Sequence, residues 1–105
     1  MRRACISDLG PLFSAGLHVT GTRWHGNFVR VSGRSARSLP GRIVVAFACS
    51  KGSTSRSVRP RRGRWSLRLR VPAHCRRAHR ANVAAAYRGD RRYRAALAGR
   101  RIARH

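Results

Sequence analysis

The sequence predicts an all-β fold, a sandwich of about seven antiparallel strands. Residues 64–71 alternate strictly between polar and apolar side chains, which is typical of a strand with one buried face. Other short apolar segments recur along the chain, separated by turn-forming Gly, Pro, Ser and Asn. A length of 105 residues suits one domain with a modest core.

Four segments before residue 64 are interpreted as strands. Residues 17–22 and 28–32 alternate, with a Gly-Asn turn signal between them. Residues 42–49 are apolar on both faces and β-branched at three consecutive positions, which favours a central strand covered on both sides. Residues 54–58 are short and polar and are predicted to form an edge strand.

The strand at 64–71 directs one set of side chains inward and the other outward. The inward set is Trp65, Leu67, Leu69 and Val71, and the outward set is Arg64, Ser66, Arg68 and Arg70. Pro72 ends the strand because it has no N–H for the ladder.

Two C-terminal segments, 76–88 and 91–104, fit either strands or helices. Their alanines raise the helix propensity. As strands, they point Val83, Ala85 and Tyr87 inward, with Tyr93, Leu97 and Ile102 as anchors in the last segment. The strand option completes the sandwich, whereas the helix option gives an α+β fold, a five-stranded sheet followed by basic C-terminal helices. We favour strands.

The first residues are expected to lie outside the folded domain. The chain begins like a signal peptide with Met1-Arg2-Arg3, but Asp8 and Gly10-Pro11 interrupt the apolar run that a signal peptide needs. We predict a poorly ordered leader or linker at 1–16 and the sandwich domain at 17–105. No apolar stretch approaches the roughly 18 residues of a membrane-spanning helix.

The charge balance is extreme. The chain has 25 Lys plus Arg against 2 acids, for a formal net charge of +23, and Lys51 is the only lysine. One interpretation is mutational bias toward GC-rich codons, which encode Arg, Ala, Gly and Pro. The other is contact with a polyanion, either nucleic acid or an acidic surface.

The scarcity of acids argues against catalysis. Asp8 and Asp90 are the only carboxylate side chains, so a glycosidase pair or an acidic cage for Mg²⁺ or Ca²⁺ is barely possible. The nucleophile elbow Gly-x-Ser-x-Gly is absent from the sequence. We therefore expect no enzymatic activity and no cofactor.

Cysteine positions suggest a disulfide between Cys49, at the end of a predicted central strand, and Cys75, just after the next long strand. Two reduced, buried thiols are the alternative, and Cys5 is left over. A zinc site with His74 and His79 lacks the paired ligand spacing of known zinc frameworks, so no metal is predicted.

Five arginines are the candidate polyanion contacts. Arg64, Arg68 and Arg70 share the outer face of their strand, and Arg76 and Arg77 follow it closely in the chain. Nucleic acid, if bound, would be held through its phosphates without sequence preference.

Three stretches resemble bacterial immunoglobulin-like repeat domains of secreted and surface proteins. Residues 87–96 match a Y-x-G-D-x-x-Y-x-x-A ending, residues 40–45 a proline-glycine turn followed by G-x-V-x-V, and residues 62–69 a G-x-W-S-x-x-L strand. The resemblance spans roughly 17–102, although this chain is far more basic than such repeats. It implies an immunoglobulin-like sandwich with Trp65 and Tyr87 as core aromatics and Gly89-Asp90 as a turn.

These observations lead to two functional hypotheses. The first is a non-catalytic structural, adhesion or spacer module of an exported or cell-surface protein. Its partners would be anionic cell-surface polymers or neighbouring domains of a longer chain. The second is a basic protein that binds nucleic acid without sequence specificity.

Overall fold

The computed structural model describes residues 13–104, which form seven strands and one short 3₁₀ turn. The strands are β1 (His18–His25), β2 (Phe28–Arg34), β3 (Ile43–Cys49), β4 (Gly52–Val58), β5 (Arg64–Arg70), β6 (Arg80–Tyr87) and β7 (Ala96–Ala103), and the turn η1 is Ala73–Cys75. The strand option for the C-terminal segments is confirmed, and the helical alternative is wrong. Among the described residues, no helix has the length and apolar character needed to cross a membrane.

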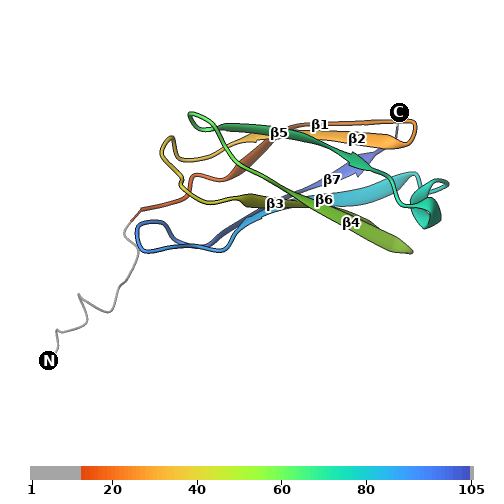
Figure 1. Cartoon of the computed structure of the whole chain (residues 1–105). Helices are drawn as coiled ribbons and strands as arrows, with labels where there is room; N and C mark the ends of the chain where they lie inside the picture. The colour runs from red at the N-terminus through yellow and green to blue at the C-terminus, as the bar shows by residue number, and fades with distance from the viewer. Residues whose placement is uncertain (1–12, 105) are drawn as a thin grey trace, which may run out of the picture.

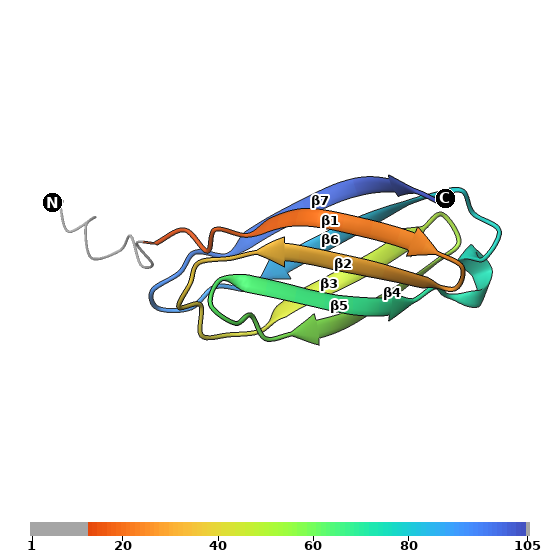
Figure 2. The same ribbon diagram turned by 90° about the horizontal axis from the view of Figure 1, so that it is seen from above.

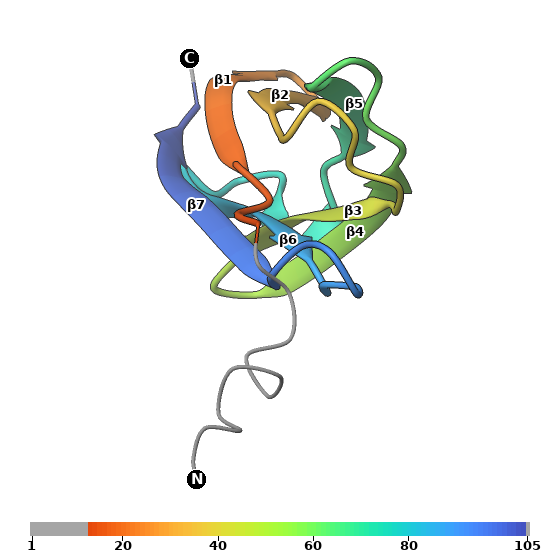
Figure 3. The ribbon, with the colours of Figure 1, turned by 90° about the vertical axis from the view of Figure 1, so that its left-hand side faces the viewer.

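The strands form two antiparallel sheets that stack as a sandwich (Figure 1). One sheet has the order β1-β2-β5 and the other the order β4-β3-β6-β7. At the two sides of the sandwich, β7 lies next to β1 and β4 lies next to β5 (Figure 3). In constant-type immunoglobulin domains the fourth strand joins the sheet of the first, second and fifth strands. Here β4 pairs with β3 instead, at the edge where a polar strand was predicted.

The core consists of the inward residues of both sheets. Trp65 is 4% exposed and Tyr87 is 3% exposed, so both predicted core aromatics are confirmed. Trp24 from β1 meets Phe47 from β3 edge to face, with ring centroids 5.1 Å apart. Such pairs add to the stabilisation from burial, and this one joins the two sheets.

Two predicted burial assignments are wrong. Val44 in β3 is 47% exposed and Leu97 in β7 is 77% exposed. β3 is central in hydrogen bonding, but only its inner face is packed, because no described element covers the outer face of the four-stranded sheet. The other two anchors of the last segment, Tyr93 and Ile102, are buried as predicted.

The packed chain begins before the predicted boundary at residue 17. Ala15 is 1% exposed and its carbonyl accepts a hydrogen bond from the Ala36 N–H. Phe13 forms a parallel bridge with Tyr93. Residues 13–16 therefore pack onto the sandwich, while residues 1–12 of the predicted leader, with Cys5, lie outside the described residues.

A tight turn between β4 and β5 carries an unusual arginine. Arg61 and Arg64 exchange two backbone hydrogen bonds across Arg62 and Gly63. Both turn residues have positive φ, 51° for Arg62 and 79° for Gly63, as a type I′ turn requires. Arginine seldom occupies this left-handed region, and here the turn exposes its side chain at one end of the sandwich.

Candidate polyanion-binding face

The predicted disulfide is present. The sulfur atoms of Cys49 and Cys75 are 2.00 Å apart, with the Cα atoms 5.8 Å apart. Cys49 ends β3, and Cys75 ends η1, where the chain crosses from β5 in one sheet to β6 in the other. The bond therefore ties this crossover to the four-stranded sheet. In residues 13–104, no three His, Cys, Asp or Glu side chains form a group that could hold a metal ion.

The outward side chains of β1, β2 and β5 form a surface that we name the cationic face. Strand register places Arg23, Arg30 and Arg68 in one row across the three strands. Neighbouring strands are about 4.8 Å apart, so these side chains are direct neighbours. Six arginines belong to this face, all exposed: Arg23, Arg30, Arg34, Arg64, Arg68 and Arg70.

Within residues 13–104, no carboxylate side chain belongs to the cationic face. Asp90, the only acidic side chain in residues 13–104, lies in the loop between β6 and β7. Its carboxylate accepts hydrogen bonds from the Tyr87 hydroxyl and from the backbone N–H groups of Arg92 and Tyr93. These bonds, that of Tyr87 foremost, lower the pKa of Asp90. Like charges on directly opposite strand positions repel, and an anion bound to the face would relieve that repulsion.

The predicted contact residues divide into two groups. Arg64, Arg68 and Arg70 lie on the cationic face, as their alternation indicated. Arg70 also lines a hollow of about 380 Å³ together with Arg76, which follows η1. Arg77 is exposed beside Arg76 in the chain. The structure thus brings Arg76 next to the end of the face.

Sequence reasoning missed half of the cationic face. Arg23, Arg30 and Arg34 are each at least three positions from the next arginine, so they do not stand out as a cluster along the chain. The alternation of residues 28–32 was the available signal, since it places Arg30 opposite to the buried Val29 and Val31.

An exposed aromatic ring also belongs to the cationic face. Phe28 is 40% exposed, and the guanidinium carbon of Arg68 lies 4.5 Å from its ring centroid. The ring holds this guanidinium by a cation–π contact. Trp24 and Trp65 are both buried, so neither tryptophan belongs to this face.

Three other arginines donate hydrogen bonds to backbone carbonyl groups of the sandwich. Arg56 of β4 donates to the Arg68 carbonyl at 3.2 Å, and Arg100 of β7 donates to the Val19 carbonyl at 3.1 Å. Each bond joins edge strands of different sheets. Arg104 donates to the carbonyls of Ala78 and Cys75. These guanidinium groups therefore have a structural role in the sandwich.

The opposite surface, the outer face of the four-stranded sheet, has a different composition. Its two central rows are uncharged: Ser57, Val44, Ala86 and Leu97, and then Ser55, Ala46, Ala84 and Gly99. Its arginines, Arg80 and Arg101, lie toward one end. The two exposed sheet faces of one chain therefore differ sharply in charge.

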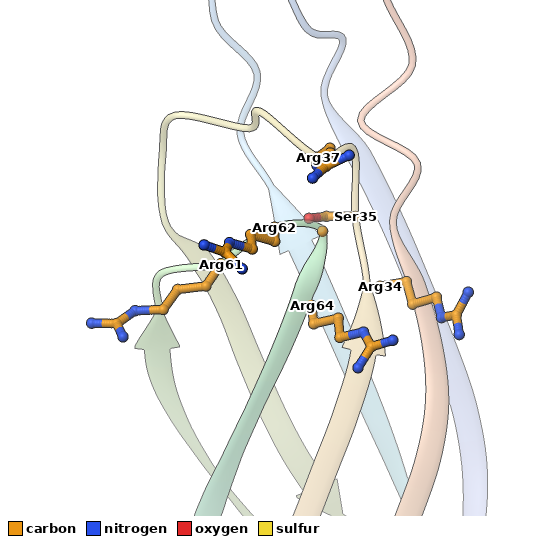
Figure 4. A pocket seen from close by; sticks show the side chains of 7 residues that line it. Arg34, Ser35, Arg37, Arg61, Arg62 and Arg64 are labelled. Atoms are coloured by element: carbon orange, nitrogen blue, oxygen red, sulfur yellow. The ribbon is translucent and has the colours of Figure 1, made fainter.

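The cationic face continues onto one end of the sandwich. Five arginines border a hollow of about 570 Å³ there: Arg34, Arg37, Arg61, Arg62 and Arg64. Arg34 and Arg64 point to one side of this hollow, and Arg61 and Arg62 point to the other (Figure 4). The arginines ring the hollow and do not converge on one point, an arrangement that suits an extended anion.

Comparisons of the chain with protein-family models, with curated proteins and with solved structures found no match. The resemblance to bacterial immunoglobulin-like repeats stays a prediction from the sequence motifs.

Proposed function

We propose that this chain is a non-catalytic sandwich module of an exported or cell-surface protein, held to anionic surface polymers by its cationic face. The observation that carries the proposal is the segregation of charge between the two sheets. Six arginines lie on the outer face of β1, β2 and β5, whereas the four strands of the other sheet carry two, Arg80 and Arg101, on their outer face. Mutational bias would add arginine to both sheet faces alike. The unequal distribution of arginine therefore favours a binding role for the cationic face.

Two further features support this assignment. The Cys49–Cys75 disulfide is of the kind that persists in oxidising compartments, which favours export. The cationic face spans three adjacent strands, β1, β2 and β5, which lie side by side in Figure 2. Guanidinium groups spaced regularly across three strands suit a long polymer with repeated charges better than a single small molecule.

The test compares two double variants with the same change in net charge. Arg30→Gln/Arg68→Gln removes two neighbours from the cationic face, and Arg80→Gln/Arg101→Gln removes two arginines from the other sheet. Binding to a glycerol-phosphate polymer is measured by calorimetry across a salt series. We expect the first variant to lose about tenfold in affinity and to flatten the salt slope by about 1.4 to 1.8, because each phosphate contact contributes about 0.7 to 0.9 to that slope through counterion release.

The control variant should bind within about twofold of the wild type. Equal losses in both variants would mean that only net charge matters, and would refute a dedicated face. A single-stranded oligonucleotide serves as competitor in the same assay. If it displaces the polymer at equal phosphate concentration and physiological salt, the nucleic-acid hypothesis replaces the surface-polymer one.

A further inference from the structure

A row of hydroxyl groups lies between the arginine rows of the cationic face. Register pairs Gly21 of β1 with Ser32 of β2, and Ser32 with Ser66 of β5. Arg30 and Arg34 flank Ser32 along β2, and Arg64 and Arg68 flank Ser66 along β5. Residues two apart on one strand are about 6.7 Å apart. The hydroxyl row therefore has guanidinium groups on both sides.

This row forms a hollow that we name the notch. It has a volume of about 420 Å³, and its lining includes Thr20, Ser32, Ser66, Arg34 and Arg64. Arg34 and Arg64 also border the hollow at the end of the sandwich, so the two hollows share a wall. An extended chain could therefore run from the end of the sandwich into the notch.

Gly21 lies against the hydroxyl of Ser32, which lines the notch. A Cβ atom at this position would lie 2.9 Å from the Ser32 Oγ atom, closer than real Cβ atoms approach. The register shift between Val19 and Gly21 marks an irregularity of β1 at this point, and such bulges occur often beside functional sites. The Ser32 hydroxyl donates to the Gly21 carbonyl at 3.5 Å, the long limit of a hydrogen bond, so it can turn toward a better acceptor.

We propose that the notch binds a phosphate group of the polymer, a proposal that rests on the proposed function. The Ser32 and Ser66 hydroxyls would donate from the floor, and the guanidinium groups of Arg34 and Arg64 would donate from the side. A tetrahedral phosphate can direct oxygens to donors on several sides. A planar carboxylate is satisfied by one guanidinium fork and leaves the hydroxyls unused.

The test uses variants that leave the charge unchanged, which separates the notch from general electrostatic attraction. Gly21→Ala crowds the Ser32 hydroxyl and forces it to move, and Ser66→Ala removes an exposed hydroxyl from the floor of the notch. The matched controls lie on the other sheet. A Cβ at Gly99 would meet its nearest atom, the Val83 carbonyl oxygen, at an ordinary 3.5 Å, and Ser55 is an exposed strand serine like Ser66.

The probes are a glycerol-phosphate polymer and poly-glutamate of equal charge number. We expect Gly21→Ala and Ser66→Ala each to weaken phosphate-polymer binding by about five- to tenfold, and to leave poly-glutamate binding within about twofold. Gly99→Ala and Ser55→Ala should change neither. Ser66→Ala keeps the test valid if Gly21→Ala disturbs the strand.

Two outcomes would refute the proposal that the notch binds phosphate. One is an unchanged affinity for the phosphate polymer in Ser66→Ala, and the other is an equal loss for both polymers. Either result can occur while Arg30→Gln/Arg68→Gln still weakens binding, in which case the proposed function stands and only the notch is rejected. If the arginine variants bind like their controls, the proposed function itself fails.

Discussion

Loss of the Cys49–Cys75 disulfide should cost this domain a large part of its stability. The bond joins residues separated by 26 positions. In the chain-entropy treatment, closing a loop of that size lowers the entropy of the unfolded chain by about 12 cal/mol/K, or about 3.5 kcal/mol at 25 °C. The free energy of unfolding of small domains is about 5–15 kcal/mol, so the crosslink supplies between about a quarter and more than half of that free energy.

Two perturbations separate the crosslink from packing. A reductant breaks the bond and leaves both sulfur atoms in place, whereas Cys49→Ala/Cys75→Ala also removes them. Cys75 is 0% exposed, so the alanine variant should lose about 1 kcal/mol more than the reduced protein. Both experiments use a Cys5→Ser background, which prevents exchange with the remaining thiol.

Urea unfolding followed by tryptophan fluorescence measures the loss, because Trp24 and Trp65 are both buried. The melting temperature should fall by roughly 14 to 28 °C, since a domain of this size loses about 4 to 8 °C per kcal/mol. The m-value should rise, because the open chain exposes more surface when unfolded. A loss below about 1 kcal/mol with an unchanged m-value would refute the loop-entropy reasoning.

Three other predictions concern the core and the loops. Gly33→Ala should cost about 3 kcal/mol or prevent folding, because its Cβ would lie 2.2 Å from Trp65 Cζ2; urea unfolding measures this. The pKa of Tyr87 is raised, chiefly by burial, to about 12. The contribution of its neutral hydroxyl to the free energy of unfolding is therefore complete below about pH 10 and is lost as the pH rises toward 12. Tyr87→Phe should therefore show a shallower fall in urea midpoint between these pH values, and an identical fall would contradict this. Arg104→Met should cost about 2 kcal/mol in thermal unfolding, because it removes a guanidinium 4.6 Å from the Trp24 ring centroid and its bonds to two carbonyls. A loss of less than about 0.5 kcal/mol, the usual range for surface substitutions, would show that these contacts of Arg104 do not stabilise the fold.

The parts of the fold that depend on local alternation could be predicted from the sequence. Trp65 lies in the core because every second residue of a strand points the same way, and that period is visible in residues 64–71. The same argument placed Tyr87 inward once 76–88 was interpreted as a strand rather than a helix. The alanines of that segment weakened the prediction, because their helix propensity conflicts with a strand in which half the positions are buried.

Other parts depend on pairing between distant strands. The apolar character of Val44 and Leu97 suggested burial, yet both lie in one row on an uncovered sheet face. Local sequence shows that a strand has two faces but not which face meets a second layer. The row of Arg23, Arg30 and Arg68 was hidden for the same reason, since its members come from three strands that only the register brings together.

The scarcity of acids links the fold to the proposed function. In most proteins an arginine beside a carboxylate is both hydrogen-bonded and neutralised. Here Arg56 and Arg100 each donate a hydrogen bond to a backbone carbonyl across an edge of the sandwich, which uses one nitrogen of the guanidinium but leaves its charge unbalanced. The fold therefore uses arginine for hydrogen bonding without reducing the net charge of +23. The arginines of the cationic face have neighbours of the same sign, so an external polyanion is the partner that would lower their electrostatic energy most.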